Sequence, residues 1–319
     1  MKNLIIVTIL LCQTLSGFTQ TTEAEELLKT IREDSVNGWK KGGVISTGFS
    51  QAAFTNWAAG GLNSVAINGL LSVYANNKSG NMTWDNTLDI GYGVLKQGES
   101  DKFIKTDDKI DFSSKFGQKA SEKWYYAALV NLKTQLTSGY NYPNDSVTIS
   151  QLFAPAYALI AIGMDFKPND KFSMFITPLT AKMTIVGDTD LANAGAFGVE
   201  PAQLDLNGNV LMAGKNFRGE FGGYLKLAFS SEIMENVTLQ SKADFFTNYS
   251  ENPQNIDVNW ETLLSLKVNK YITTTLATHL IYDDDTKVDV DENGDGTIDS
   301  TGPRTQFKEV LSIGFSYKF

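Results

Sequence analysis

The chain ends in Gly314-Phe315-Ser316-Tyr317-Lys318-Phe319, where an aromatic residue stands at every second position up to the terminus. Side chains alternate between the two faces of a strand. Counting back from the end, one face is therefore apolar, with Phe307, Leu311, Ile313, Phe315, Tyr317 and Phe319. The other face is polar. A strand with one face for lipid and one for water is typical of an outer-membrane barrel, although an edge strand of a soluble β-sandwich could end in the same way.

The beginning of the chain favours the membrane interpretation. Lys2 precedes an apolar run from Leu4 to Leu11, and small and polar residues follow as far as Gln20. This is the pattern of a secretory signal peptide, which we place at residues 1–19. Its removal would take away Cys12, the one cysteine of the chain, and leave no thiol for a disulfide. Lipidation of Cys12 is disfavoured because Leu11 is too large for the residue before a lipidated cysteine.

Composition narrows the class of protein further. No later apolar run approaches the roughly 18 to 20 residues of a membrane helix, so an integral membrane protein with this sequence has to be a closed barrel. The formal net charge of −9 argues against a nucleic-acid partner, which would require a basic surface. Aromatic residues and glycines are spread evenly, and we therefore expect one barrel domain.

Residues 20–42 are predicted to form a short amphipathic helix, Thr22 to Asn37, and a linker; both would lie in the periplasm. From residue 43 to 319 the hydrophobic period is two, and about twelve strands can be counted. The connections between them alternate strictly between short turns rich in Asn, Gly, Pro and Lys and mostly long loops. The predicted fold is therefore an all-β, transmembrane, antiparallel up-and-down β-barrel of about 12 strands with a short N-terminal periplasmic helix.

Charged residues on the inward faces of these strands are closely balanced between acids and bases. Because a barrel of about twelve strands is narrow, we expect them to pair and fill the lumen rather than line an open pore. The segments Leu152 to Phe166 and Phe172 to Val186 alternate poorly. Their second apolar face could contact the N-terminal helix, another subunit or a hydrophobic lumen, and the pattern does not choose among these.

The sharpest local motif is Asp291-Glu292-Asn293-Gly294-Asp295-Gly296-Thr297-Ile298-Asp299. Oxygen ligands recur at every second residue, and Gly296 permits a sharp turn, as in calcium loops. We predict a structural Ca²⁺ site in the last outer loop with these ligands: Asp291, Asn293, Asp295, Thr297 and Asp299. A full EF-hand would have a bidentate Glu where Gly302 stands, and the flanking helices are missing, so the alternative is a solvated acidic turn.

Two further features could form a catalytic or binding site. His279 is the single histidine and the easiest general base, but strand parity places it in the lumen, away from any lipid substrate. The first outer loop contains Asn56, Trp57, Gly60 and Gly61. An aromatic residue among small ones can fold inward as a plug or contact a partner, and Trp57 could equally belong to the aromatic girdle at the membrane interface.

Several spaced motifs resemble a Bacteroidota family of outer-membrane barrels that is classed as a domain of unknown function. The resemblance rests on Asn56-Trp57-Ala58-Ala59-Gly60-Gly61, Trp84-Asp85-Asn86, Thr134-Gln135 with Gly139-Tyr140, Ser150 with Ala154-Pro155-Ala156-Tyr157, Gly198-Val199 and Tyr282-Asp283-Asp284-Asp285. It extends over nearly all of the mature chain. It implies the fold and an outer-membrane location, and it implies no activity or ligand.

These observations predict a non-enzymatic outer-membrane protein with a structural or interaction role, a largely filled lumen and no catalytic residues. The alternative is a narrow channel for small or amphiphilic solutes, and a membrane-lipid enzyme is a third, less favoured reading. Expected partners are outer-membrane lipid, other outer-membrane proteins, and the barrel-assembly machinery, which would recognise the C-terminal strand ending in Phe319. Ca²⁺ is the one cofactor expected.

Overall fold

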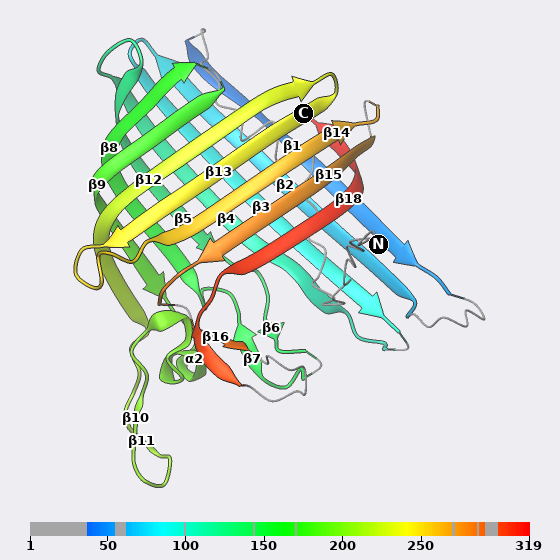
Figure 1. Ribbon diagram of the computed structural model, residues 1–319, viewed down its shortest axis with the longest axis vertical. Helices are drawn as coiled ribbons and strands as arrows, with labels where there is room; N and C mark the ends of the chain where they lie inside the picture. The colour runs from blue at the N-terminus through cyan, green and yellow to red at the C-terminus, as the bar shows by residue number, and fades with distance from the viewer. Residues whose placement is uncertain are drawn as a thin grey trace, which may run out of the picture.

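The computed structural model describes residues 37–54, 62–98, 100–142, 144–169, 171–269, 272–285, 287–290 and 299–319. Within these residues, twelve antiparallel strands close into one barrel (Figure 1). The predicted fold class is confirmed. The segment assigned to a signal peptide and nearly all of the predicted N-terminal helix lie outside the described residues. Among the described helices, none has the length and apolar character needed to cross a membrane.

The barrel strands follow one another around the wall in chain order. They are β1 (Gly38–Ala52), β2 (Ser64–Ser79), β3 (Met82–Gln97), β4 (Ile104–Lys119), β5 (Trp124–Thr134), β8 (Ala156–Asn169), β9 (Phe172–Ile185), β12 (Phe217–Met234), β13 (Val237–Asn248), β14 (Asp257–Lys267), β15 (Ile272–Tyr282) and β18 (Gln306–Lys318). Short turns connect the strands at one end of the barrel and longer loops at the other, as the sequence predicts.

The barrel is closed by pairing of its first and last strands. β1 and β18 run antiparallel with Val44 opposite Lys318 and Gly48 opposite Gly314. Beyond this register, the backbone N–H of Phe319 donates to the Gly43 carbonyl at 3.0 Å, and the N–H of Gly43 donates back at 3.1 Å. A Cβ at Gly43 would lie 2.7 Å from the Phe319 ring and 2.8 Å from the Ser72 carbonyl oxygen. Glycine is therefore required for this close approach.

The two faces of the wall differ as strand parity predicts. In β18, Phe307, Leu311, Ile313, Phe315 and Tyr317 face outward with more than half of each side chain exposed, whereas Gly314 is buried. Outward apolar residues continue around the barrel on the neighbouring strands, including Trp260, Ile160 and Phe221. The outer surface is thus a broad apolar band.

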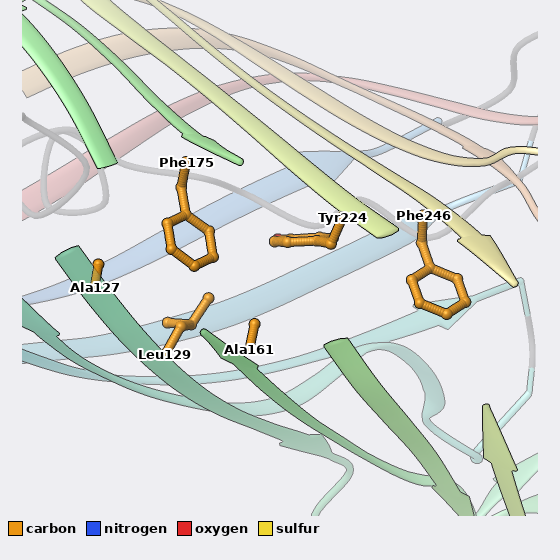
Figure 2. Close-up of a cluster of buried hydrophobic side chains, with 6 residues drawn as sticks. All are labelled: Ala127, Leu129, Ala161, Phe175, Tyr224 and Phe246. Carbon is orange, nitrogen blue, oxygen red and sulfur yellow. The ribbon is translucent and has the colours of Figure 1, made fainter. Parts of the chain in front are cut away.

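The poorly alternating segments are explained by an apolar part of the lumen. Ala161 of β8 and Phe175 of β9 face inward and join Ala127, Leu129, Tyr224 and Phe246 in a buried cluster (Figure 2). β8 begins at Ala156, so Leu152 to Pro155 belong to the preceding loop, not to the strand expected from Leu152. In β9, the consecutive residues Pro178 and Leu179 are both exposed. Before them the odd-numbered residues face inward, and after them the even-numbered residues do.

The long loops carry their own small elements. Between β5 and β8 lie β6 (Gly139–Tyr140) and β7 (Thr148–Ser150), and between β15 and β18 lie β16 (Lys287–Val290) and β17 (Ser300–Pro303). The loop after β9 holds α2 (Thr189–Asn193), η1 (Ala196–Gly198) and the hairpin of β10 (Gln203–Leu204) and β11 (Val210–Met212). Ala192 and Val199 of this loop pack with Ala154 and Val186 in a second buried cluster, which anchors the loop to the barrel.

The glycines of the wall provide a test of how tightly its strands pack. A Cβ at Gly222 would overlap the carbonyl oxygen of Thr247 on the neighbouring strand, whereas at Gly69 the nearest atom would be 3.8 Å away. We expect Gly222→Ala to lower the free energy of unfolding by about 1–3 kcal/mol. The matched variant Gly69→Ala should change it by less than about 0.5 kcal/mol. Urea unfolding of the detergent-solubilised barrel measures both, and equal effects would contradict the packing described here.

Candidate functional site

At the long-loop end, the lumen contains ion pairs between strands that are not neighbours in the wall. Nζ of Lys182 on β9 lies 2.8 Å from a carboxylate oxygen of Asp257 on β14, and β12 and β13 separate these two strands in the wall. The same ammonium lies 3.6 Å from Glu220 and 3.8 Å from Asp283. All four side chains are at least three-quarters buried. One lysine therefore joins β9, β12, β14 and the start of the last long loop.

Arg218 of β12 completes this group. Its guanidinium lies 2.9 Å from Glu220 and also donates a hydrogen bond to the carboxylate of Asp285. The neighbouring Asp284 accepts a hydrogen bond of 2.6 Å from the side-chain amide of Asn255. Because Asp283, Asp284 and Asp285 follow β15 directly, these contacts hold the start of the last loop against the mouth of the barrel.

Two further groups of paired charges lie inside the barrel. Toward the short turns, Asp165 of β8 is paired with Lys115 of β4 at 2.8 Å and with Lys167 at 3.4 Å. Farther around the wall, Asp244 of β13 lies 3.2 Å from Lys226 of β12 and accepts a hydrogen bond of 2.8 Å from the Tyr224 hydroxyl. The expectation that lumen charges pair with one another is confirmed for these residues.

The apolar cluster lies between the charged groups. The rings of Phe175, Tyr224 and Phe246 come from β9, β12 and β13, and Ala127, Leu129 and Ala161 come from β5 and β8, the next strands around the wall (Figure 2). Phe175 and Tyr224 pack edge to face with centroids 6.3 Å apart, a favourable aromatic geometry. Lys182 Nζ lies 5.0 Å from the Phe246 centroid, so the cluster and the ion pairs are in contact.

His279 lies on the inward face of β15, as parity predicts. Its Nε2 is 2.5 Å from Oδ1 of Asn259 on β14, and its register partners are Glu261 and Lys308. The arrangement is that of a polar residue bonded within the lumen wall.

Most of the residues predicted to bind calcium or a partner lie outside the described part of the chain. These are Asp291, Asn293, Asp295 and Thr297 of the acidic loop and Asn56, Trp57, Gly60 and Gly61 of the first long loop. Asp299 is described and stands immediately before β17. Among the described residues, no group of three or more His, Cys, Asp or Glu side chains is arranged to hold a metal ion.

The alternation pattern of the sequence does not place Lys182 and Asp165 in the lumen. Both missed residues lie on the strands with poor alternation. The two successive outward residues Pro178 and Leu179 shift the inward positions of β9 by one, which brings Thr180, Lys182 and Thr184 inward. A proline in the middle of a predicted inner strand is the signal that could have revealed this shift.

Comparison with known proteins supports the fold and gives no activity. The model of a family described as "Protein of unknown function (DUF3078)" matches residues 49–140. This supports the resemblance to a family of unknown function over that stretch, while the assignment to Bacteroidota stays a prediction. The search of curated proteins finds no match.

Solved structures with a similar arrangement of strands are outer-membrane barrels. The chain is 11% identical to an outer-membrane channel from Pseudomonas putida F1, with a TM-score of 0.40, over 90% of this chain and 97% of the channel. It is 10% identical to the translocator domain of the autotransporter NalP from Neisseria meningitidis, with a TM-score of 0.33, over 91% of each chain. These likenesses concern the fold alone.

Breaking the buried Lys182–Asp257 ion pair should destabilise the barrel. Lys182→Met keeps most of the side-chain volume but leaves Asp257 and Glu220 without this partner. We expect a loss of about 3 kcal/mol in the free energy of unfolding, the lower end of the range for disrupting a buried pair. The control is Lys215→Met, since the Lys215–Glu200 pair is more than half exposed and should contribute less than about 1 kcal/mol. Equal, small losses in both variants would refute the structural role of Lys182.

Proposed function

We propose that the protein is a non-enzymatic barrel of the bacterial outer membrane with a largely filled lumen and a structural or interaction role. The location is supported by the apolar outer band, by the separation of short turns and long loops to opposite ends, and by the fold it shares with outer-membrane barrels. With the signal peptide removed, the short turns would face the periplasm. β18 and Phe319 would then be recognised by the barrel-assembly machinery.

The observation that carries the proposal is the contact between Lys182 and Asp257, which lies inside the barrel and joins strands that β12 and β13 separate in the wall. A pore for general solutes needs an open aqueous path, and side chains paired inside the barrel obstruct one. Inward-facing residues such as Asp165, Thr180 and Ser265 are also more than nine-tenths buried. In this proposal, the paired charges and the apolar cluster fill much of the space that a pore would need.

The interaction role is assigned to the loop between β9 and β12. Its hairpin of β10 and β11 projects beyond the other loops (Figure 1), and its exposed apolar side chains are Leu204, Leu206, Val210, Leu211 and Met212. Asp205 accepts hydrogen bonds from the side chain and backbone of Asn209, which hold the pKa of its carboxyl below the ordinary value. The Asp205 carboxyl is therefore ionised at neutral pH. Its hydrogen bonds to Asn209 hold the turn that carries the apolar side chains.

An enzymatic role has little support in this geometry. His279 is bonded to Asn259 inside the barrel, whereas a lipid substrate would approach from the outer face. A general base has to lie within hydrogen-bonding reach of the proton that it abstracts.

Conductance of the purified barrel in a planar lipid bilayer tests the filled lumen. We expect no steady openings for the wild-type protein. Lys182→Ala combined with Asp257→Ala should produce openings, because two side chains that project into the lumen are shortened. The matched control is Lys215→Ala with Glu200→Ala, an exposed pair in the long loop, which should remain silent. Steady wild-type openings would instead support the narrow channel.

We also propose that the acidic segment from Asp291 to Asp299 binds Ca²⁺ and stiffens the last loop. Extracellular calcium sites of this kind have dissociation constants on the order of 10⁻⁴–10⁻³ M. Calcium should therefore slow proteolysis of residues 286–299 in this concentration range. Asp295→Asn should remove the protection, while Asp205→Asn in the β10–β11 turn should keep it. Mass spectrometry of the fragments measures this, and protection that persists in Asp295→Asn would rule out the site.

A further inference from the structure

The wall of the barrel is interrupted at Pro178 on both sides of β9. Toward β8, the register shifts between Ile162 and Met164, so Gly163 faces the irregularity. Toward β12, it shifts between Gly222 and Tyr224, so Gly223 faces it from the other side. Proline has no N–H to donate to a neighbouring strand, and within sheets it is largely confined to edges and bulges. β9 is nevertheless a strand with a partner on each side.

The side chain of Thr177 bridges this break on the side of β8. The hydroxyl of Thr177 lies 2.6 Å from the Ile162 carbonyl oxygen, to which it donates, and it accepts a hydrogen bond of 3.0 Å from the N–H of Leu179. At this level of the wall, a threonine hydroxyl takes the place of regular backbone ladder bonds. A strand pair held in this way has a lower local cost of opening than an uninterrupted ladder.

Both sides of the break are apolar. On the outer surface, Ile162, Leu179 and Ile176 are 61%, 55% and 46% exposed. On the inner side, Tyr224 is the register partner of Thr177, and Phe175 lies two residues along β9. The break thus stands between the apolar outer surface and the apolar cluster of the lumen.

The cluster has the composition of a site for a hydrocarbon chain. Its three rings lie near the small side chains of Ala127 and Ala161 (Figure 2). Each of the six residues is at most 8% exposed, so a chain that binds here has to displace a ring. Barrel lumens are normally polar, and the charged groups around this cluster follow that rule. If the cluster only filled space in the lumen, the β8–β9 and β9–β12 ladders beside it would not need to be interrupted.

We propose that Pro178 marks a lateral entrance through which one hydrocarbon chain, of the kind found in a fatty acid, passes from the bilayer into the lumen. The chain binds against Phe175, Tyr224 and Ala161. This inference rests on the proposed membrane location but not on the interaction role. We infer a single-chain amphiphile because the ladders are interrupted at one position of β9 and the cluster has six residues.

The entrance can be tested with palmitate that carries a photoreactive diazirine near the end of its chain. The full-length barrel is reconstituted in phosphatidylcholine vesicles, illuminated with the probe, and digested, and the labelled residues are identified by mass spectrometry. We expect labels on outward residues such as Ile162 and on lumen residues such as Phe175 and Tyr224. Labels on outward residues alone would overturn the entrance and leave the membrane location intact. A lack of labels on both would contradict the location itself.

Two variants distinguish the lumen site from the outer surface. Ala161→Trp fills the cluster and should reduce lumen labelling several-fold, whereas Ala158→Trp, on the outward face of the same strand, should leave it unchanged. Undiminished lumen labelling in Ala161→Trp would overturn the binding site.

A crosslink tests the entrance without changing the cluster, in case Ala161→Trp does not fold. Ile162 and Leu179 are register partners, and so are Phe166 and Met174 farther along the same ladder. Ile162→Cys with Leu179→Cys should block lumen labelling when oxidised and restore it when reduced. The disulfide of Phe166→Cys with Met174→Cys should have no effect. Equal labelling in the oxidised and reduced forms of the first pair would show that the chain does not enter at Pro178.

Discussion

Closure of the sheet is the constraint on which the other features depend. In lipid, every backbone N–H and C=O has to find its partner within the protein, and a barrel achieves this only if its first strand meets its last. The two hydrogen bonds between Gly43 and Phe319 extend that seam to the end of the chain. Once the ring is closed, strand parity decides which side chains enter the lumen, and those side chains have to be compatible with one another in a confined space.

The lumen meets this requirement with two kinds of packing. Charged residues are paired with opposite charges, as with Asp165 between Lys115 and Lys167. Such pairs add little net stability when buried, because desolvation offsets their attraction, but separating them is costly. They therefore fix the relative positions of strands that are not neighbours. The aromatic cluster around Phe175 supplies ordinary apolar packing between the charged groups.

The sequence was sufficient to predict the fold, because parity and loop length are local properties that a strand of any barrel has to satisfy. Phe307 to Phe319 show this directly: their alternation follows from lipid on one side and lumen on the other. Lys182 could not be placed in the same way, since a bulge at Pro178 reverses the parity beyond it. The contact of Lys182 with Asp257 depends on the curvature of the whole ring, and no spacing in the sequence records it. For the acidic loop and Trp57, the sequence remains the source of the prediction, since Asp291 to Ile298 and Trp57 lie outside the described residues.

The seam has a consequence for the order in which the barrel assembles. Every other ladder in the wall joins strands that are consecutive around the ring and connected by a turn or loop, so each can form as a hairpin soon after its strands are available. The pairing of β1 with β18 joins the two ends of the barrel sequence and requires the largest loop closure. Until it forms, the nascent sheet has two unpaired edges, and open edges readily pair with other chains. The step that completes the structure is thus also the one during which the protein is most exposed to aggregation.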